Sequence, residues 1–227
     1  MPGPRRGRGE RRLESALEAL AGALNETRAP WMVIGGVAVI ARGVKRMTTD
    51  LDVVVQGDAI TLPVLMSRLA ASKIVGRIAN AEAFARQNLV LLLRHQPSGV
   101  DLDVSLGWTE FEREAIEASS DAAFGTVRAP MAQPQDLVIF KVVAARPKDV
   151  EDATSLLVMH RSIDLIEVRR RVAELAALAE DPSLVEALEA IVEHARPSAP
   201  APTKRRRAVT PRKSAPKKRA RSRDRKG

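Results

Sequence analysis

The sequence predicts an α+β protein in which a short mixed β-sheet is flanked by helices and followed by a helical segment. Three observations lead to this prediction: a buried strand runs into a glycine pair, two later strand-like segments carry alternating aspartates, and the second half has helical periodicity throughout. With 227 residues and 45% apolar content, the chain can form one sizeable core with extensions. Aromatic residues make up only 3%, so Ala, Val and Leu must fill that core.

The first part of the chain alternates between helical and extended patterns. Apolar residues at helical spacing predict an amphipathic helix over residues 10–26, which ends before a turn at Pro30. Residues 31–34 (WMVI) then form a buried strand, and the short helix VAVIARG follows the Gly35-Gly36 pair. The glycines are therefore expected at a strand-to-helix turn with exposed backbone N–H groups.

Further strands are expected after this turn. Residues 50–55 form one strand, and the runs 89–93 and 99–106, separated by a turn-forming stretch, predict a hairpin beside it. Apolar periodicity also predicts helices over residues 61–73, 110–118, 134–145, 148–160, 163–178 and 182–195.

Charge is distributed unevenly along the chain. Thirteen of the 37 Lys and Arg residues lie in residues 197–227 beside a single Asp, which gives this segment a net charge of +12. Residues 1–196 keep 24 basic and 27 acidic residues, a net charge of −3. The tail 197–227, rich in Lys, Arg, Pro and Ala, is therefore expected to be disordered and to bind nucleic acid through phosphate contacts, without distinguishing DNA from RNA.

Composition also excludes several classes of site and location. The chain has no cysteine, which removes disulfides, thiolate zinc sites and cysteine nucleophiles and favours a reducing compartment, with the cytoplasm as the default. No apolar run approaches the length of a membrane span, and the basic start lacks the apolar stretch of a signal peptide. The three histidines are scattered, so no histidine-based metal site is expected.

Two segments carry aspartates on alternate positions. In the first, Asp50 and Asp52 project to one face of their strand, and in the second, Asp101 and Asp103 do the same. Carboxylates gathered on neighbouring strands repel one another unless a cation compensates them. For an oxygen-only cluster the usual cation is Mg²⁺ or Mn²⁺, which points to phosphoryl chemistry.

The order of these features resembles the polymerase-β-like nucleotidyltransferase superfamily. The resemblance covers residues 31–107: a Gly-Gly turn, thirteen intervening residues, a Thr-x-Asp-x-Asp strand and a third aspartate on an adjacent strand. Residues 133–157 resemble a second block, found in the minimal nucleotidyltransferases of bacterial toxin–antitoxin and abortive-infection systems. That block places a helix with a lysine before an Arg-x-x-Asp-x-x-Asp element.

The resemblance implies a nucleotidyltransferase fold and a role for each matching position. Asp50 and Asp52 would bind the metal ions, and Asp103 would complete the metal site near the attacking hydroxyl. Asp101 is the alternative third carboxylate or an auxiliary charge. Lys141 would be a catalytic residue that contacts phosphate. The remaining implied positions bind the nucleotide (Gly35, Gly36, Arg46 and Thr49) or are auxiliary (Arg146, Asp149 and Asp152).

Several of these implied positions also have a simpler explanation. Arg46 could instead be an exposed loop arginine, although its position in the family pattern favours a phosphate contact. Lys141 could be a surface lysine on an apolar helix face, although the resemblance favours a phosphate contact here too. Asp149 and Asp152 lie in a first helical turn, where the helix dipole alone favours acidic residues. One position departs from the family pattern, because many relatives carry serine where this chain has Gly36.

Together these features divide the chain into four parts. Residues 1–12 are a basic flexible N-terminus, 13–130 the nucleotidyltransferase core, 131–196 a helical C-terminal segment and 197–227 the disordered tail. Trp31 and Trp108 are expected to pack in the core or at its rim rather than to stack on bases.

The resemblance implies transfer of a nucleoside monophosphate from an NTP to a hydroxyl acceptor, with pyrophosphate as the leaving group. The acceptor would be RNA, such as a tRNA end, or a protein, and a cognate antitoxin would be a further partner. Two alternatives stay open: a catalytically degenerate protein that binds nucleic acid through its basic tail, and a nucleotidyltransferase that modifies an antibiotic or another small molecule.

Overall fold

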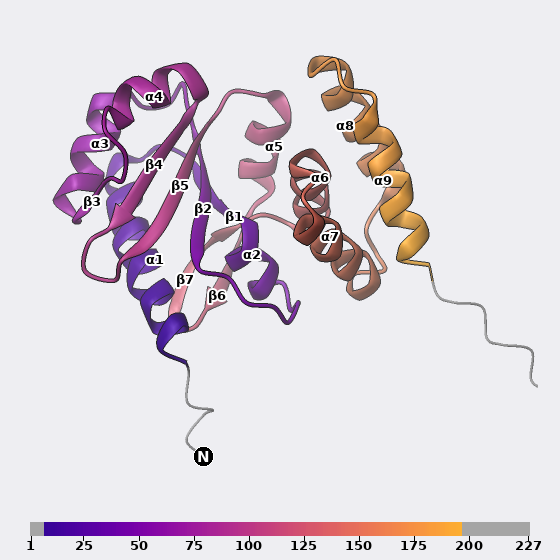
Figure 1. Ribbon diagram of the computed structural model, residues 1–227, viewed down its shortest axis with the longest axis horizontal. Helices are drawn as coiled ribbons and strands as arrows, with labels where there is room; N and C mark the ends of the chain where they lie inside the picture. Colours follow the sequence, from indigo (N-terminus) through magenta and orange to yellow (C-terminus); the bar gives the residue numbers. More distant parts are fainter. Residues whose placement is uncertain (1–6, 197–227) are drawn as a thin grey trace, which may run out of the picture. The chain divides into compact units, whose positions relative to one another are not determined.

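The computed structural model describes residues 7–196, which fold as one unit around a mixed β-sheet (Figure 1). Helices α1, α3 and α4 lie on one side of this sheet, and α5 to α9 lie on the other (Figure 1). The strands are β1 (Trp31–Ile34), β2 (Asp50–Gln56), β3 (Ile74–Gly76), β4 (Val90–His95), β5 (Val100–Gly107), β6 (Ser120–Phe124) and β7 (Val127–Met131). The helices are α1 (Arg8–Thr27), α2 (Gly35–Ala41), α3 (Leu62–Ala71), α4 (Ala81–Asn88), α5 (Glu110–Ala118), α6 (Pro134–Ala144), α7 (Pro147–Met159), α8 (Leu165–Leu178) and α9 (Ser183–His194).

The sheet is assembled around the two aspartate-bearing strands. Its order is β3-β4-β5-β2-β1-β7-β6, with β2 and β5 parallel and adjacent. Strand β1 pairs with β2 antiparallel on one side, and β4 pairs with β5 antiparallel on the other. The register of β2 and β5 sets Asp50 opposite Asp101 and Asp52 opposite Asp103. All four aspartates therefore face the same side of the sheet.

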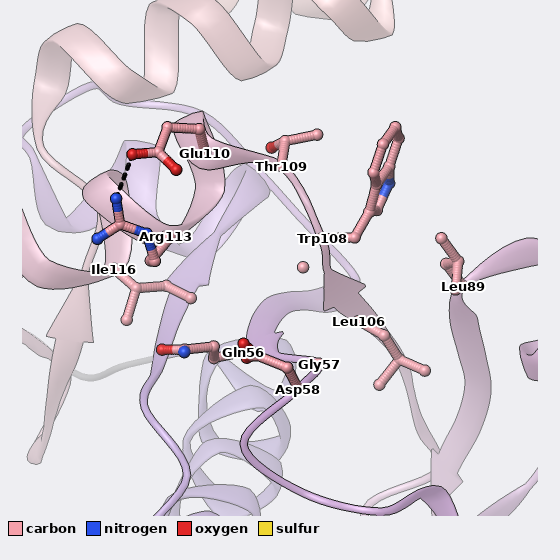
Figure 2. Close-up of a pocket in the computed structure, with 11 residues that line it drawn as sticks. Gln56, Gly57, Asp58, Leu89, Leu106, Trp108, Thr109, Glu110, Arg113 and Ile116 are labelled. Carbon is pink, nitrogen blue, oxygen red and sulfur yellow. Dashed lines mark hydrogen bonds and ion pairs between the residues drawn. The ribbon is translucent and has the colours of Figure 1, made fainter.

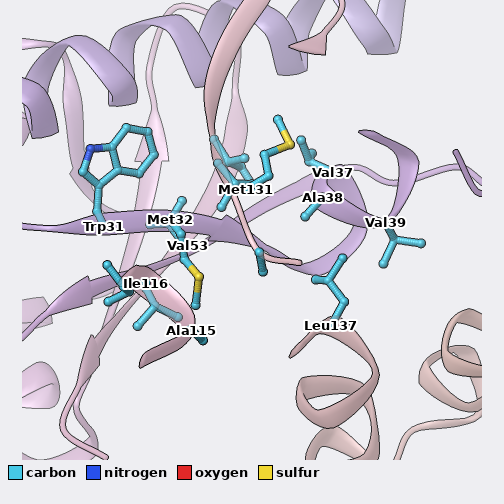
Figure 3. Close-up of a cluster of buried hydrophobic side chains, with 14 of the residues drawn as sticks. Trp31, Met32, Val37, Ala38, Val39, Val53, Ala115, Ile116, Met131 and Leu137 are labelled. Carbon is cyan, nitrogen blue, oxygen red and sulfur yellow. The ribbon is translucent and has the colours of Figure 1, made fainter. Parts of the chain in front are cut away.

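A continuous apolar core fixes these strands in place. Helix α1 contributes fully buried Leu17, Leu20 and Leu24, which recur at helical spacing. Met131 of β7 and Val37 of α2 belong to the same cluster of buried side chains (Figure 3). Burying each of these larger side chains contributes on the order of 2 kcal/mol. No helix within residues 7–196 is both long and apolar enough to cross a bilayer.

Most elements occur where the sequence predicts them, including the hairpin of β4 and β5 and the helices of the second half. The N-terminal helix differs, because α1 begins at Arg8 rather than at residue 10, so residues 8–12 of the segment expected to be flexible are helical. A bond between the Gly7 backbone N–H and the Glu10 carboxylate, 3.2 Å long, explains this earlier start. Residues 1–6 and the tail 197–227 lie outside the described residues.

The glycine pair also differs from the prediction. Gly35 and Gly36 form the first turn of α2 instead of preceding the helix. Four further elements were not predicted, and three of them are peripheral strands: β3, β6 and β7. Strand β3 has only three residues, whereas β6 and β7 are poor in β-branched residues and β7 contains Pro130, so all three lack the alternating pattern by which strands are recognised. The fourth is α4.

Candidate functional site

The carboxylate face consists of Asp50 and Asp52 on β2 and of Asp101 and Asp103 on β5. Strand alternation turns all four toward the side covered by α5 to α9, while Leu51 of β2 and its equivalents point into the core. Each carboxylate-bearing residue is partly buried. The sequence therefore predicts the position of this face correctly.

Asp52 is the central member of the carboxylate face. Burial raises its pKa to about 6, and the nearby charges of Asp50 and Asp103 act in the same direction. The positive charges of Lys141 and Arg146 lower this pKa only in part. Asp52 therefore lies where negative charge from three residues accumulates and is incompletely compensated by the protein.

Asp50 has a different environment. Burial would raise its pKa, but a hydrogen bond from Thr48 and the charge of Lys148 outweigh burial, so the pKa lies below its usual value. The Thr48 hydroxyl donates to Asp50 Oδ1 over 2.6 Å. Thr49, the residue predicted to bind nucleotide, is exposed instead. Neither Thr48 nor Lys148 is among the site residues predicted from the sequence.

Two arginines that were also missed hold the carboxylates of β5. Arg77 Nη1 lies 2.5 Å from Asp103 Oδ1 and also donates to the backbone carbonyl of Leu102 at 3.1 Å. Arg94 on β4 donates from Nε to Asp101 at 2.6 Å, and this hydrogen bond holds the pKa of Asp101 below its usual value. Arg77 lies 26 residues from Asp103 in sequence, so no local pattern reveals this contact. Arg94 lies opposite Asp101 in the predicted hairpin, and this pairing was the signal that could have identified it.

The glycine pair lies directly against β2. Gly35 has φ +63°, and a Cβ at this position would collide with the carboxylate of Asp52, so only glycine fits. A Cβ at Gly36 would collide with the Thr48 hydroxyl and lie 3.4 Å from Cζ of Arg46. Thr48 thus occupies the space that a side chain at position 36 would need.

A cluster of charged side chains, most of them buried, lies beside this turn, and we call it the α6–α7 cluster. Lys141 Nζ is 2.8 Å from Asp149 Oδ1 and 3.0 Å from Asp152 Oδ2. Arg146 Nε donates to Asp149 Oδ2 over 2.5 Å, and Arg46 pairs with Asp152. Three cations and two carboxylates leave this cluster with one net positive charge. Asp149 therefore contacts both Lys141 and Arg146.

Exposure differs strongly within the α6–α7 cluster. The side chain of Lys141 is 5% exposed, whereas that of Arg146 is 59% exposed. Lys141 is therefore not the surface lysine of the simpler interpretation. An ammonium group has three donors, and two of those of Lys141 face carboxylates. Arg146 presents a larger free surface to an incoming anion.

The carboxylate face fits a divalent cation in its donor type. It offers oxygen ligands only, and the pKa of Asp52 is raised first by burial and then by the negative charges of Asp50 and Asp103, which a cation would compensate. Within residues 7–196, however, no three potential ligands stand together closely enough to hold an ion. Asp50 and Asp103 instead face Thr48 and Arg77, so binding an ion requires at least one carboxylate to turn.

A cavity of about 360 Å³ opens beside the carboxylate face, and we call it the carboxylate cavity. Asp50, Asp101 and Asp103 line it together with Arg77 and with Arg12 of α1. This cavity is large enough for part of a substrate to reach the acidic side chains.

Comparison with known proteins assigns the family. A family model described as "Nucleotidyltransferase of unknown function (DUF6036)" matches residues 11–194. The chain belongs to this nucleotidyltransferase family. No curated protein sequence matches it.

Solved structures of several nucleotidyltransferases resemble this one. The solution structure of the antibiotic-resistance factor ANT(2'')-Ia aligns with a TM-score of 0.52 and 16% identity, over 80% of this chain and 98% of that chain. The crystal structure of ANT(2")-Ia in complex with adenylyl-2"-tobramycin gives a TM-score of 0.50 and 15% identity, over 78% and 98%. An antigenic nucleotidyltransferase-like protein from Paracoccidioides brasiliensis gives 0.48 and 17% identity, over 79% and 93%.

These identities are too low to transfer a substrate, so the first two alignments establish the shared fold alone. The expected α+β nucleotidyltransferase fold is thereby confirmed, and the chain is an enzyme of the nucleotidyltransferase class.

Proposed function

We propose that this nucleotidyltransferase moves a nucleoside monophosphate from an NTP to a hydroxyl group of RNA or of a protein, with release of pyrophosphate. Asp50, Asp52 and Asp103 would hold Mg²⁺ or Mn²⁺. When bound, the cation would lower the pKa of the acceptor hydroxyl and offset charge on the phosphoryl oxygens.

One observation carries the proposal: two opposite sets of charge meet at Asp52. On one side lie Asp50 and Asp103, and on the other the charges of Lys141 and Arg146 reach the same carboxylate. A triphosphate donor needs both, because the cations of the protein would offset the charge of its oxygens while the acidic residues would hold the metal ion at the reacting phosphoryl group.

The α6–α7 cluster and the glycine turn suit the phosphates of the donor. Gly35 and Gly36 let Asp52 and Thr48 pack directly against the first turn of α2, where backbone N–H groups have no partner within the helix. Arg46 adjoins this turn, and Arg146 is the most exposed cation of the cluster. Asp149 and Asp152 would orient these cations rather than touch the substrate. Thr49, exposed in the carboxylate cavity, would contact the nucleotide or the acceptor there.

Asp103 is suited to contact the hydroxyl group of the acceptor. Its Oδ1 accepts from Arg77, which leaves Oδ2 for a cation or for the attacking hydroxyl. Asp101 is the less suitable third carboxylate, because Arg94 contacts both of its oxygens, at 2.6 and 3.2 Å.

RNA or a protein is favoured over a polycationic antibiotic as the acceptor. A polycation would bind through free carboxylates, yet Asp101 and Asp103 in the carboxylate cavity are already paired with Arg94 and Arg77. The basic tail, with a net charge of +12, would add affinity for RNA. The resemblance to toxin–antitoxin nucleotidyltransferases supports the same class of acceptor and a cognate antitoxin as partner.

The likeness in fold to ANT(2'')-Ia supports the small-molecule alternative, since that protein was solved with adenylyl-2"-tobramycin. A catalytically degenerate nucleic-acid-binding protein is disfavoured. Such a protein gains nothing from keeping repelling carboxylates together beside Asp52.

The test incubates the full chain with each labelled NTP, Mg²⁺ and total RNA, and repeats the reaction with tobramycin and with cell protein as acceptors. Label on RNA or protein that disappears in Asp50→Ala/Asp52→Ala, and persists in the exposed-surface variant Asp121→Asn, supports the proposal. Label on tobramycin alone supports the small-molecule enzyme. RNA binding without label, lost on deletion of residues 197–227, would establish the binding protein instead.

A further inference from the structure

The few aromatic side chains of this protein gather at one place. The chain has two Trp, four Phe and no Tyr. Three of these six residues, Trp108, Phe111 and Phe140, line a single cavity of about 330 Å³, which we call the aromatic cavity. The rings of Phe111 and Phe140 lie 4.9 Å apart with a 51° tilt. In a protein whose core is built from aliphatic residues, this concentration needs a specific explanation.

Trp108 departs from the expectation that both tryptophans pack in the core. Trp31 is 5% exposed and donates its indole N–H to Asn25 at 3.1 Å, as a core residue does. Trp108 is 64% exposed. It also borders a second cavity of about 440 Å³, the distal cavity, and Figure 2 shows the indole turned away from the Gln56 and Asp58 side chains of that cavity. A large exposed indole beside a concave apolar surface is an uncommon arrangement that marks a binding site.

The aromatic cavity adjoins the proposed phosphate-binding residues. Its wall includes Ile34, the residue before Gly35, and Phe140, the residue before Lys141. Its floor is the carboxylate face continued along the strands, with Val54 two positions beyond Asp52 and Ser105 two positions beyond Asp103. None of these residues lines the carboxylate cavity, in which the acceptor would approach Asp103.

The lining chemistry suits a flat apolar ring. No Lys, Arg or Asp borders the aromatic cavity, and Glu112 is its single charged residue. Glu112 Oε2 already accepts from the backbone N–H of Thr109 at 3.0 Å and from the Thr109 hydroxyl at 2.8 Å, so both residues serve the start of α5. Phosphate and polycations therefore find no partner here, whereas aromatic side chains stack on nucleobases.

We propose that the aromatic cavity binds the base of the donor nucleotide, stacked against Trp108 and Phe140, while the triphosphate lies at Gly35-Gly36 and the α6–α7 cluster. This inference rests on the proposed function and adds the donor's base-binding site to it. Because few free polar groups face the cavity, the base is selected by stacking rather than by hydrogen bonds. Purines bind more tightly than pyrimidines, and ATP and GTP are discriminated weakly.

Trp108 reports on this site directly, since the second indole of the chain is buried. The full-length protein is titrated with ATP, GTP, CTP and UTP in Mg²⁺ while tryptophan fluorescence is recorded. Inorganic triphosphate is the baseless control, and a short single-stranded RNA is the acceptor control. The expected result is quenching by the nucleotides, stronger for the purines, with none from triphosphate, and the same quenching in Trp31→Phe. Quenching by the RNA but not by the nucleotides overturns the donor assignment.

Variants test the same inference without the fluorescence signal. Equilibrium dialysis with labelled ATP is expected to give about tenfold weaker binding for Trp108→Leu and for Phe140→Leu. Leu89→Ala, which alters the distal cavity alone, serves as the matched control and is expected to bind ATP like the parent protein. Unchanged ATP affinity in both aromatic variants, or an equal loss in Leu89→Ala, overturns the inference. Thermal unfolding of each variant shows that it is folded.

The two proposals fail in different ways. If the parent protein labels an acceptor and Trp108 does not respond to nucleotide, the base-binding inference is wrong and the proposed function stands. If nucleotides quench Trp108 and bind less tightly in the variants, yet no acceptor is labelled, the base-binding site stands and the proposed transfer reaction is wrong.

Discussion

Helices α6 and α7 begin in the same way, yet their first turns have opposite electrostatics. Helix α6 starts with Pro134 and carries Asp136 two residues later, and α7 starts with Pro147 and carries Asp149 at the same position. Both aspartates are buried, with 7% and 0% relative exposure. Their local sequence favours an acidic residue in each case, because a first turn attracts negative charge.

The partners of the two carboxylates differ completely. Burial would raise the pKa of Asp149, but hydrogen bonds from Arg146 and Lys141 outweigh it and hold the pKa below its usual value. Burial raises the pKa of Asp136 to about 6, since the charge of Arg42 and a backbone hydrogen bond at Gln133 compensate it only in part. Its Oδ2 is buried without a hydrogen-bond partner.

The local motif thus offers both aspartates a favourable position at a helix start. Their tertiary partners decide whether each one raises or lowers the free energy of unfolding. Asp149 is surrounded by the cations that the proposed triphosphate would use. The prolines and aspartates alone cannot distinguish a helix start that organises a charged site from one that only buries a polar group.

The same substitution should therefore act in opposite directions at the two positions. Asp149→Asn is expected to lower the free energy of unfolding by about 3 kcal/mol at pH 7, because it breaks a buried ion pair and leaves Lys141 undercompensated. Urea denaturation measures this loss. Since the pKa of Asp149 is lowered in the folded state, its stabilisation is present above the ordinary value of 3.8 and disappears as the pH falls through the folded pKa. A loss that persists unchanged at pH 3 would contradict this electrostatic origin.

Asp136→Asn is expected to raise the free energy of unfolding by about 2 kcal/mol at pH 7. A carboxyl with a folded pKa near 6 and an ordinary value of 3.8 is destabilising once both states are ionised, above about pH 6. The penalty develops as the pH rises from about 4 to 6, so the advantage of the variant should shrink on acidification and vanish below pH 4. Parallel urea titrations across this range check the result. A destabilised variant at pH 8 would mean that Asp136 has a charge partner in solution.

A smaller difference is expected between the two arginines that hold the β5 carboxylates. Arg77→Met should lower the transfer rate about tenfold, because it releases Asp103 from its orientation beside the reacting groups. Arg94→Met removes a more exposed pair with Asp101, so stability should change by less than about 1 kcal/mol and the rate should stay within about twofold. The two variants are compared by their initial transfer rates at saturating NTP. Equal losses in both variants would mean that the two carboxylates act together.

The central fold could be predicted from the sequence because its signals are strong. Residues 31–34 and 50–55 combine apolar runs with glycine and alternating aspartates, and both lie in the middle of the sheet. The outer strands β6 and β7 carry alanine, charge and proline instead of a regular apolar pattern. Strand β6 is an edge strand, which needs little burial, and β7 lies between it and β1. Their existence became apparent only when tertiary pairing was known.

In the candidate site, the acidic residues could be predicted from the sequence. The arginines that pair with them could not. Strand alternation places Asp50, Asp52 and Asp103 on one face whatever surrounds them. The bond from Arg77 to Asp103 joins residues 26 positions apart, and that from Arg46 to Asp152 joins residues 106 apart, so no local pattern reveals them. Exposure of Trp108 likewise depends on helices that follow it in the chain.

Binding of Mn²⁺ tests most directly whether the carboxylate face is a cation-dependent catalytic site. The parent protein, Asp50→Asn/Asp52→Asn and the surface control Asp121→Asn are each titrated with Mn²⁺ in the presence of NTP, and free Mn²⁺ is measured by electron paramagnetic resonance. We expect the parent and Asp121→Asn to bind alike and the double variant to bind at least about tenfold more weakly, in line with the loss of two charged oxygen ligands. Equal Mn²⁺ affinity in all three proteins would contradict the assignment of Asp50 and Asp52 as metal ligands.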